Sequence, residues 1–260
     1  MKNRIKELLS TRKTGILSMY YTAGFPALAD TNTIAEALAT SGADIIEIGI
    51  PYSDPVADGP TIQASNTVAL KNGMRVSMLI EQVKQIRKKI NIPIILMGYI
   101  NPVLQYGIEK FAKDAADAGV DGVILPDMPM DEYIEHYKTL FDSLNLSNTF
   151  LISPTTSEER IRKIDAVTDG FIYAVSASSI TGAKGKFEKV QLDYFDRIKK
   201  MKLKNPYLIG FGISNHESFA IASQYGAGAI VGSAFVDLLK NSKDLNTDIT
   251  AFVRSLKNGQ

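Results

Sequence analysis

Carboxyl side chains are concentrated in one short stretch that begins in an apolar run and continues into a loop. Residues 47–60 contain Glu47, Asp54 and Asp58 together with three prolines. Isoleucines flank Glu47, and a carboxyl group in such poorly solvated surroundings has a raised pKa, which suits it to proton transfer. Asp58, on the loop, stays ionised more easily. Glu47 is therefore a candidate for proton transfer, and Asp58 is a loop acid with a different expected protonation state.

Each of these acids also has a structural interpretation. Glu47 could line a barrel and pair with a Lys or Arg side chain. Asp54 and Asp58 could stabilise turns, since Asp beside Pro and Gly is common in loops. A Mg²⁺ site formed by the three acids is a further alternative. Acid-rich loops often hold no metal, and the sequence has no Cys and two His, so we expect no metal site.

Glycines follow two apolar runs near the end of the chain. Gly210, Phe211 and Gly212 follow one run, and Gly232 and Ser233 follow the next. Glycine lets backbone N–H groups approach an anion closely, and the loops after the last two strands of a barrel often bind phosphate. Simple turn geometry is the alternative for any single glycine. The paired positions predict a phosphate-binding site.

Aromatic side chains also occur at the ends of apolar runs. They are Tyr20, Tyr21, Tyr99, Tyr173 and Phe211. If they point inward, they form an apolar slot for a flat ring, although some could simply pack in the core. The Tyr173 hydroxyl could also bond a substrate hydroxyl or a carboxylate.

The elements that must position these side chains alternate along the chain. Short β-rich runs alternate with segments of helical periodicity, which predicts parallel strands joined by helices. The predicted strands are 16–21, 45–48, 94–97, 122–125, 149–152, 170–174, 207–210 and 229–231. The helical stretches include 31–40, 77–89, 109–118, 131–144, 158–166, 194–201 and 216–225. Eight such units predict one α/β domain over residues 1–260, a (βα)8 (TIM) barrel, with an extra helix within residues 1–13.

Composition excludes several classes of function. The net charge of +1 provides no broad field for binding nucleic acid or an anionic membrane. The sequence has no apolar run long enough to span a bilayer and no secretory signal. We therefore expect a cytoplasmic protein.

The segment Glu47-Ile-Gly-Ile-Pro-Tyr-Ser-Asp-Pro-Val-Ala-Asp-Gly-Pro-Thr-Ile-Gln63 resembles the signature of tryptophan synthase alpha chains. Further similar segments cover almost the whole chain. They are Tyr21-Thr-Ala-Gly-Phe-Pro26, Met97-Gly-Tyr-Ile-Asn-Pro102, Leu125-Pro-Asp-Met-Pro129, Ser153-Pro-Thr-Thr156, Tyr173-Ala-Val-Ser176 with Thr181-Gly182, and Gly210-Phe-Gly-Ile213.

The resemblance implies retro-aldol cleavage of indole-3-glycerol phosphate to indole and glyceraldehyde 3-phosphate, without a metal or an organic cofactor. It assigns the main acid/base role to Glu47, and to Asp58 the role of binding the indole N–H. It implies substrate contacts for Tyr173, Tyr20, Tyr99, Ile124, Phe211 and Thr181, and a phosphate cradle of Gly182, Gly212, Gly232 and Ser233.

The resemblance also implies a partner, a beta subunit that carries pyridoxal phosphate, receives the indole and forms an α2β2 assembly. Many members of the family carry Arg immediately after the residue that matches Ser176, whereas this chain has Ala177. Two other functions share parts of the pattern. A phosphosugar isomerase or another lyase would use the same phosphate site, and a non-catalytic scaffold would keep the interface loops. The presence of both Glu47 and Asp58 favours the cleavage reaction.

Overall fold

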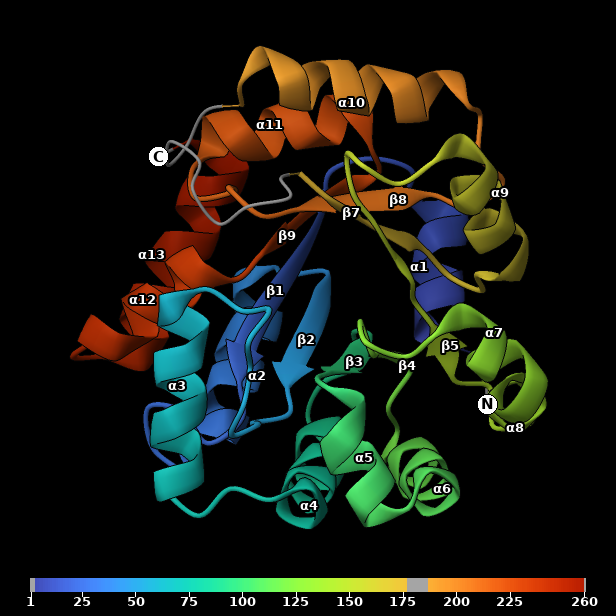
Figure 1. Cartoon of the computed structure of the whole chain (residues 1–260). Helices are drawn as coiled ribbons and strands as arrows, with labels where there is room; N and C mark the ends of the chain where they lie inside the picture. The colour runs from blue at the N-terminus through green and yellow to red at the C-terminus, as the bar shows by residue number, and fades with distance from the viewer. Residues whose placement is uncertain (1–2, 177–186, 260) are drawn as a thin grey trace.

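Nine parallel strands form one curved sheet in the computed structural model, which describes residues 3–176 and 187–259. The order is β5-β4-β3-β2-β1-β9-β8-β7-β6. The strands are β1 (Ile16–Thr22), β2 (Ile45–Gly49), β3 (Ile94–Met97), β4 (Gly122–Ile124), β5 (Ser147–Asn148), β6 (Leu151–Ile152), β7 (Ile172–Val175), β8 (Tyr207–Gly210) and β9 (Gly228–Val231). Figure 1 shows the strands in the middle of the molecule and the helices around them.

The two edge strands, β5 and β6, stand where a single strand was predicted at 149–152: β6 lies within that range, and β5 ends at Asn148, just before it. β5 pairs with β4 and β6 pairs with β7. Between them, the Thr149 N–H donates to the Val123 carbonyl at 3.0 Å, and the Tyr173 N–H donates to the Phe150 carbonyl at 3.0 Å. This short segment therefore joins the two edges of the sheet. The predicted α/β barrel is confirmed, with its fifth strand divided in two.

Helices connect the strands and cover their outer side. They are α1 (Arg4–Thr11), α2 (Asp30–Ser41), α3 (Pro60–Lys71), α4 (Val76–Arg87), α5 (Ile100–Tyr106), α6 (Ile108–Ala118), α7 (Met130–Glu132), α8 (Lys138–Ser143), α9 (Glu158–Val167), α10 (Lys189–Lys200), α11 (His216–Tyr225), α12 (Ser233–Asn241) and α13 (Leu245–Asn258). A π-helical turn, η1 (Tyr133–Tyr137), separates α7 from α8 within the helix predicted at 131–144. Helices α3 and α5 were not predicted from the sequence, and both lie next to the candidate site.

Alternate residues of each strand face opposite sides, because side chains of a strand point in turn to its two faces. An inner cluster of buried side chains fills the barrel and includes Ile16, Ile45, Ile95 and Ile124. A larger outer cluster lies between the strands and the helices and includes Leu17, Ile46 and Leu96. A polar side chain at an inward position of a strand therefore lies inside the barrel, beside the inner cluster.

Helix α1, the extra helix predicted near the N-terminus, covers the end of the barrel at which the strands begin. Its Ile5 and Leu9 belong to the inner cluster. The Asn3 side chain accepts hydrogen bonds from the first turn of α1 and donates to the Asp121 carbonyl at 2.7 Å. Asp121 also pairs with Arg4 at 3.1 Å and Arg87 at 2.9 Å. With this end closed, access to the interior is from the ends at which the strands finish.

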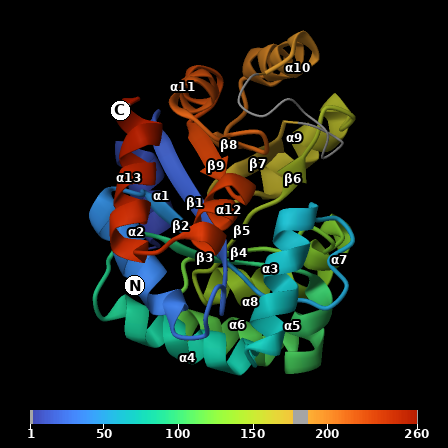
Figure 2. The same ribbon diagram turned by 90° about the vertical axis from the view of Figure 1, so that its left-hand side faces the viewer.

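Helix α3, which follows the acid-rich loop, lies beside helix α12 (Figures 1 and 2). The Thr61 hydroxyl on α3 donates to the Asp237 carboxylate on α12 at 3.2 Å. Two segments that are far apart in the sequence therefore meet at the same side of the barrel. Among the helices of the described ranges, none is both long and apolar enough to cross a membrane.

Candidate active site

Glu47 lies at the centre of the candidate site, near the end of β2. It pairs in register with Tyr20 on β1, and its side chain is fully buried. The Ser18 hydroxyl donates a hydrogen bond to Glu47 Oε1 at 2.6 Å. Glu47 Oε2 is buried and has no hydrogen-bond partner among the described residues. One carboxylate oxygen is therefore held by β1, and the other is left for a ligand.

Burial controls the protonation of Glu47. Loss of hydration raises the pKa of Glu47 from 4.5 to about 7, and the hydrogen bond from Ser18 opposes this rise. A carboxyl group with this pKa can both give and take a proton near neutral pH. Among residues 3–176 and 187–259, Glu47 forms no ion pair with Lys or Arg, and its hydrogen-bond partner is Ser18.

Asp58 lies in the loop after β2, where Tyr99 contacts it. The Tyr99 hydroxyl accepts a hydrogen bond from the Ala57 N–H at 3.0 Å and also bonds the Asp58 carboxylate. Burial raises the pKa of Asp58 from 3.8 to about 6, against the lowering effect of Tyr99. The expectation of an exposed loop acid was wrong, because Asp58 is half-buried. The expected order is still obtained, since Asp58 ionises more easily than Glu47.

Asp54, the third acid of the segment, is separated from this arrangement. It is exposed, and its carboxylate accepts from the Ser53 hydroxyl at 2.5 Å. Within the described ranges, Glu47, Asp54 and Asp58 do not form a group of three acids that could hold a metal ion. The alternative of a Mg²⁺ site built from these three residues is therefore not supported.

The rings of Tyr20 and Tyr173 each lie against a glycine at the end of a neighbouring strand. A Cβ atom on Gly49 would lie 2.3 Å from the Tyr20 hydroxyl oxygen, and one on Gly210 would lie 2.3 Å from that of Tyr173. Only glycine leaves room for either ring. Tyr21, the next residue on β1, faces the helices instead and donates to the Thr31 carbonyl at 2.8 Å.

Tyr173, Phe211 and Ile124 are brought together around the same space. The rings of Tyr173 and Phe211 meet edge to face with centroids 6.4 Å apart. Ile124 ends β4 and packs with Tyr173 in the inner cluster. Phe211 remains partly exposed, at 39%. The aromatic slot expected from the sequence stays a prediction, and the contacts described are the ring contact of Tyr173 with Phe211 and the packing of Tyr173 and Ile124 in the inner cluster.

The turn after β8 has an unusual backbone. Phe211 has φ of +68° and Gly212 has φ of +76°, and the Ser176 hydroxyl donates to the Phe211 carbonyl at 2.7 Å. A left-handed conformation costs a non-glycine residue about 1–2 kcal/mol, and such strain is concentrated at functional sites. After β9, Gly232 is the N-cap of α12, which begins at Ser233. The phosphate site expected at these two segments stays a prediction.

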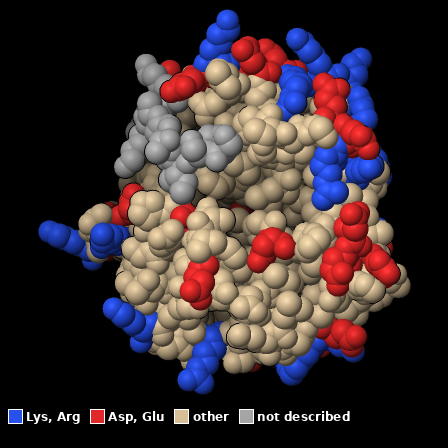
Figure 3. Space-filling view, in the orientation of Figure 1, with Lys and Arg blue, Asp and Glu red and all other residues tan. Residues whose placement is uncertain are grey.

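The predicted residues Thr181 and Gly182 lie outside the described residues. On the face drawn in Figure 3, Lys and Arg side chains lie mostly along the edge, and a hollow lies near the middle, where Figure 1 shows the strands.

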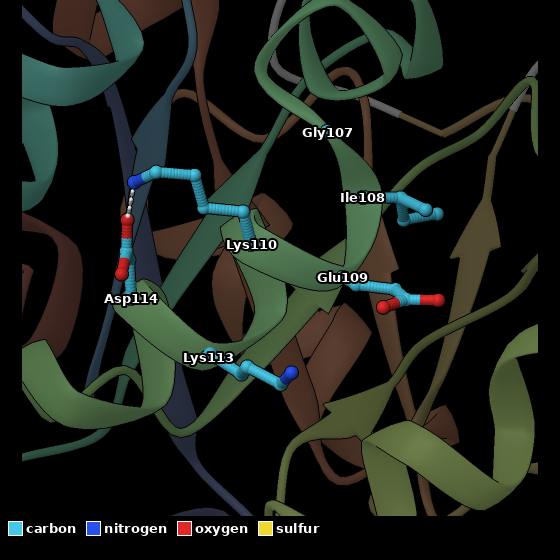
Figure 4. Close-up of a pocket in the computed structure, with 6 residues that line it drawn as sticks. All are labelled: Gly107, Ile108, Glu109, Lys110, Lys113 and Asp114. Atoms are coloured by element: carbon cyan, nitrogen blue, oxygen red, sulfur yellow. Dashed lines mark hydrogen bonds and ion pairs between the residues drawn. The ribbon is translucent and has the colours of Figure 1, made fainter.

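A second surface hollow lies outside this arrangement. Figure 4 shows that its lining comes from α6 and the glycine before it, namely Gly107, Ile108, Glu109, Lys110, Lys113 and Asp114. Lys110 pairs with Asp114 there, one turn further along the same helix. The lining of this hollow includes none of the predicted site residues. The hollow is therefore separate from the candidate active site at the strand ends.

Sequence reasoning missed the residues that hold the acids in place. Ser18 bonds Glu47, and Asn66 on α3 accepts from the Tyr52 N–H at 3.2 Å in the acid-rich loop. Ser18 and Tyr20 are two apart on β1 and so face the same side. A polar residue at this spacing in an apolar strand was the available signal for Ser18.

The parallel β/α barrel is an enzyme architecture whose active sites lie at the carboxyl ends of the strands. Comparison with known proteins gives the family. The family model for the tryptophan synthase alpha chain matches residues 6–259. The chain is 55% identical to the tryptophan synthase alpha chain of Flavobacterium psychrophilum, over 90% of this chain and 92% of the relative. It is 51% identical to that of Parabacteroides distasonis, over 98% and 99%.

Solved structures agree with this assignment. Tryptophan synthase subunit alpha from Legionella pneumophila has a TM-score of 0.88 and 35% identity, over 99% of this chain and 98% of that chain. Tryptophan synthase from Mycobacterium tuberculosis also gives a TM-score of 0.88, with 32% identity over 100% of this chain and 98% of that chain. The chain belongs to the tryptophan synthase alpha chain family, and it is a lyase.

Proposed function

We propose that Glu47 and Asp58 carry out the cleavage of indole-3-glycerol phosphate into indole and glyceraldehyde 3-phosphate. The observation that supports this most directly is the buried, unpartnered oxygen of Glu47 at the open end of the barrel. An ionisable group with a shifted pKa in such a position is typical of a general acid or base.

The cleavage needs two proton movements. A proton is added to C3 of the indole ring, and a proton is removed from the hydroxyl on the adjacent side-chain carbon. The O–H electrons then form the aldehyde, the carbon–carbon bond breaks, and its electrons restore the aromatic ring. Glu47, with a pKa of about 7, can serve in either step.

Asp58 has a different role in this proposal. Protonation at C3 places positive charge on the indole nitrogen. An ionised Asp58 accepts a hydrogen bond from the ring N–H and stabilises that charge as it develops. Its pKa of about 6 keeps it mostly ionised at neutral pH. The neighbouring aromatic side chains of Tyr20, Tyr99, Tyr173 and Phe211, with Ile124, supply an apolar slot for the ring.

The phosphate of the substrate is assigned to the turn after β8 and to the start of α12. Gly212, Gly232 and Ser233 contribute backbone N–H groups, and the helix dipole favours an anion at this end. From the family motif, Gly182 is assigned to the same phosphate site and Thr181 to the contacts with the substrate. These backbone N–H groups would then hold the phosphate end of the substrate, and Glu47 and Asp58 would contact its indole end.

Family membership implies a beta subunit as the partner, and we propose an α2β2 assembly in which that subunit carries pyridoxal phosphate and receives indole. The mechanism assigned to this chain uses proton transfer by its own side chains.

The test is the release of indole from indole-3-glycerol phosphate by the purified chain in the presence of EDTA. A parallel sample contains a tryptophan synthase beta subunit. We expect indole and glyceraldehyde 3-phosphate in equal amounts, and faster release with the beta subunit. No release in either sample would reject the proposed reaction.

A further inference from the structure

Asp127, in the loop after β4, is an acid that the proposed mechanism does not use. Its carboxylate accepts a hydrogen bond from the Ile100 N–H at 2.9 Å. Ile100 is the first residue of α5, and the residue before it is Tyr99, whose hydroxyl contacts the acid-rich loop after β2. The bond therefore connects the loop after β4 to the backbone that carries Tyr99.

The start of α5 depends on this bond because the helix has no cap of its own. α5 has seven residues, and within the described part of the chain its N-cap residue, Tyr99, forms no side-chain cap hydrogen bond. The first N–H groups of a helix have no partner inside the helix, and the helix dipole favours a carboxylate beside them. Asp127 thus supplies, from the loop of another strand, the cap that the sequence of α5 lacks.

Contacts pass from the start of α5 to the acid-rich loop. The Ala57 N–H donates to the Tyr99 hydroxyl at 3.0 Å. The ring centroids of Tyr52 and Tyr99 are 5.2 Å apart, and the Asn101 side chain donates to the Tyr52 hydroxyl at 3.0 Å. The place of the loop at Ala57, one residue before Asp58, is therefore set by the place of Tyr99.

The backbone is supported on both sides of Tyr99. On one side, the Gly98 N–H donates to the Ile124 carbonyl of β4 at 3.1 Å. On the other side, the Ile100 N–H donates to the Asp127 carboxylate. Loss of the Asp127 side chain removes the second support, so the Tyr99 ring becomes free to turn away from the acid-rich loop.

We propose that Asp127 is a positioning residue for the cleavage reaction. Its hydrogen bond to Ile100 fixes Tyr99, and Tyr99 holds the acid-rich loop where Asp58 meets the indole N–H. Asp127 itself does not touch the substrate. This inference rests on the proposed function, in which Asp58 binds the ring N–H. Since the action is a hydrogen bond, it needs an acceptor oxygen at position 127 and not a charge.

The test compares two substitutions in the full chain without a beta subunit. Asp127→Ala should lower kcat/KM for indole-3-glycerol phosphate about fivefold, as expected for one partly exposed hydrogen bond. Asp127→Asn keeps an acceptor oxygen and should retain most of the wild-type kcat/KM. The inhibition constant of glyceraldehyde 3-phosphate should be unchanged in both variants, because this product lacks the ring that Asp58 binds.

A double substitution tests whether Asp127 acts through Tyr99. Combined with Tyr99→Phe, Asp127→Ala should cause little further loss of kcat/KM, since residues in one network are not additive.

Asp244→Ala is the matched control, because the Asp244 carboxylate accepts from the N–H groups of Asn246 and Thr247 at the start of α13. It removes the same kind of helix cap at a different helix. Asp244→Ala should lower the midpoint of denaturant unfolding as Asp127→Ala does, and it should leave kcat/KM unchanged.

Three results would overturn the inference. Wild-type kcat/KM in Asp127→Ala would show that the bond to Ile100 does not matter for the reaction. Equal losses in Asp127→Ala and Asp127→Asn would mean that the charge acts and not the hydrogen bond. A full further loss in the Tyr99→Phe background would mean that Asp127 acts independently of Tyr99. A failure of the proposed function is different, since the wild-type chain would then release no indole.

Discussion

Ser18 on β1 donates a 2.6 Å hydrogen bond to Glu47 on β2, and it is the side-chain contact that opposes the effect of burial on this acid. The neighbouring strands thus set the pKa of Glu47 between them. β2 carries the carboxyl group into the interior of the barrel, and β1 supplies the donor that keeps its pKa near 7.

Removal of this donor should shift the pH dependence of cleavage. In the base step Glu47 must be ionised, so kcat/KM should fall as pH decreases through about 7. The Ser18→Ala variant lacks the hydrogen bond that lowers this pKa. Its fall in kcat/KM should therefore be displaced to higher pH, by up to about one pH unit. A profile that superimposes on that of the wild type would show that Ser18 does not act on the titrating group.

The Glu47→Gln variant should be more stable than the wild type in alkaline solution. The folded chain favours protonated Glu47, so this contribution to stability is fully present below pH 4.5 and is lost as pH rises through about 7. Gln is neutral throughout and can still accept from Ser18. Denaturant unfolding at pH 8 should show a gain of up to about 3 kcal/mol, which vanishes near pH 4. A constant difference across this range would contradict the raised pKa.

The hydroxyl of Tyr99 should be needed to hold Asp58. Tyr99→Phe removes its bonds to the Asp58 carboxylate and to the Ala57 N–H. Since the first bond lowers the pKa of Asp58, that pKa should rise, and kcat/KM should fall about tenfold at pH 7. Tyr52→Phe is the control. The ring centroids of Tyr52 and Tyr99 are 5.2 Å apart, but the Tyr52 hydroxyl accepts a hydrogen bond from the Asn101 side chain at 3.0 Å. Equal losses in the two variants would argue against a specific role for Tyr99.

A methyl group at Gly212 should weaken the binding of phosphate. Gly212→Ala places a side chain where the backbone has φ of +76° and is proposed to approach the anion. We expect an increase in KM of about tenfold or more together with a stability loss of about 1–2 kcal/mol. Gly73→Ala provides the comparison, since Gly73 has φ of +89° and open space around it. It should lose stability by a similar amount and keep its KM.

The strands could be predicted from the sequence because each is a short apolar run between turns. The single strand predicted at 149–152 is replaced by two short strands, 147–148 and 151–152, because each of them pairs with a different neighbour. Helices α3 and α5 were not predicted, since Pro60 and Pro102 in their first turns are typical of loops as well. Proline is tolerated there because the first N–H groups of a helix have no partner within it.

The candidate site could be predicted only in part. Glu47 was correctly expected to be buried with a raised pKa. The adjacent Ile46 and Ile48 belong to the outer cluster, however, and the burial of Glu47 comes from its inward position on β2, on the side of Ile45. The burial of Asp58 depends on Tyr99, which is 41 residues away in the chain and reaches it only through the pairing of β2 with β3. The contact between Ser18 and Glu47 likewise depends on strand register. The assignments of Thr181 and Gly182 stay predictions.

The most direct test of the proposed mechanism is the turnover of indole-3-glycerol phosphate by the Glu47→Gln variant, with binding of the substrate measured in parallel. Loss of a general acid or base costs roughly 10²–10⁴ in rate. We expect at least such a loss of kcat, with the dissociation constant for the substrate within a few-fold of the wild type. Near-normal turnover by this variant would contradict the assignment of Glu47 as the acid/base.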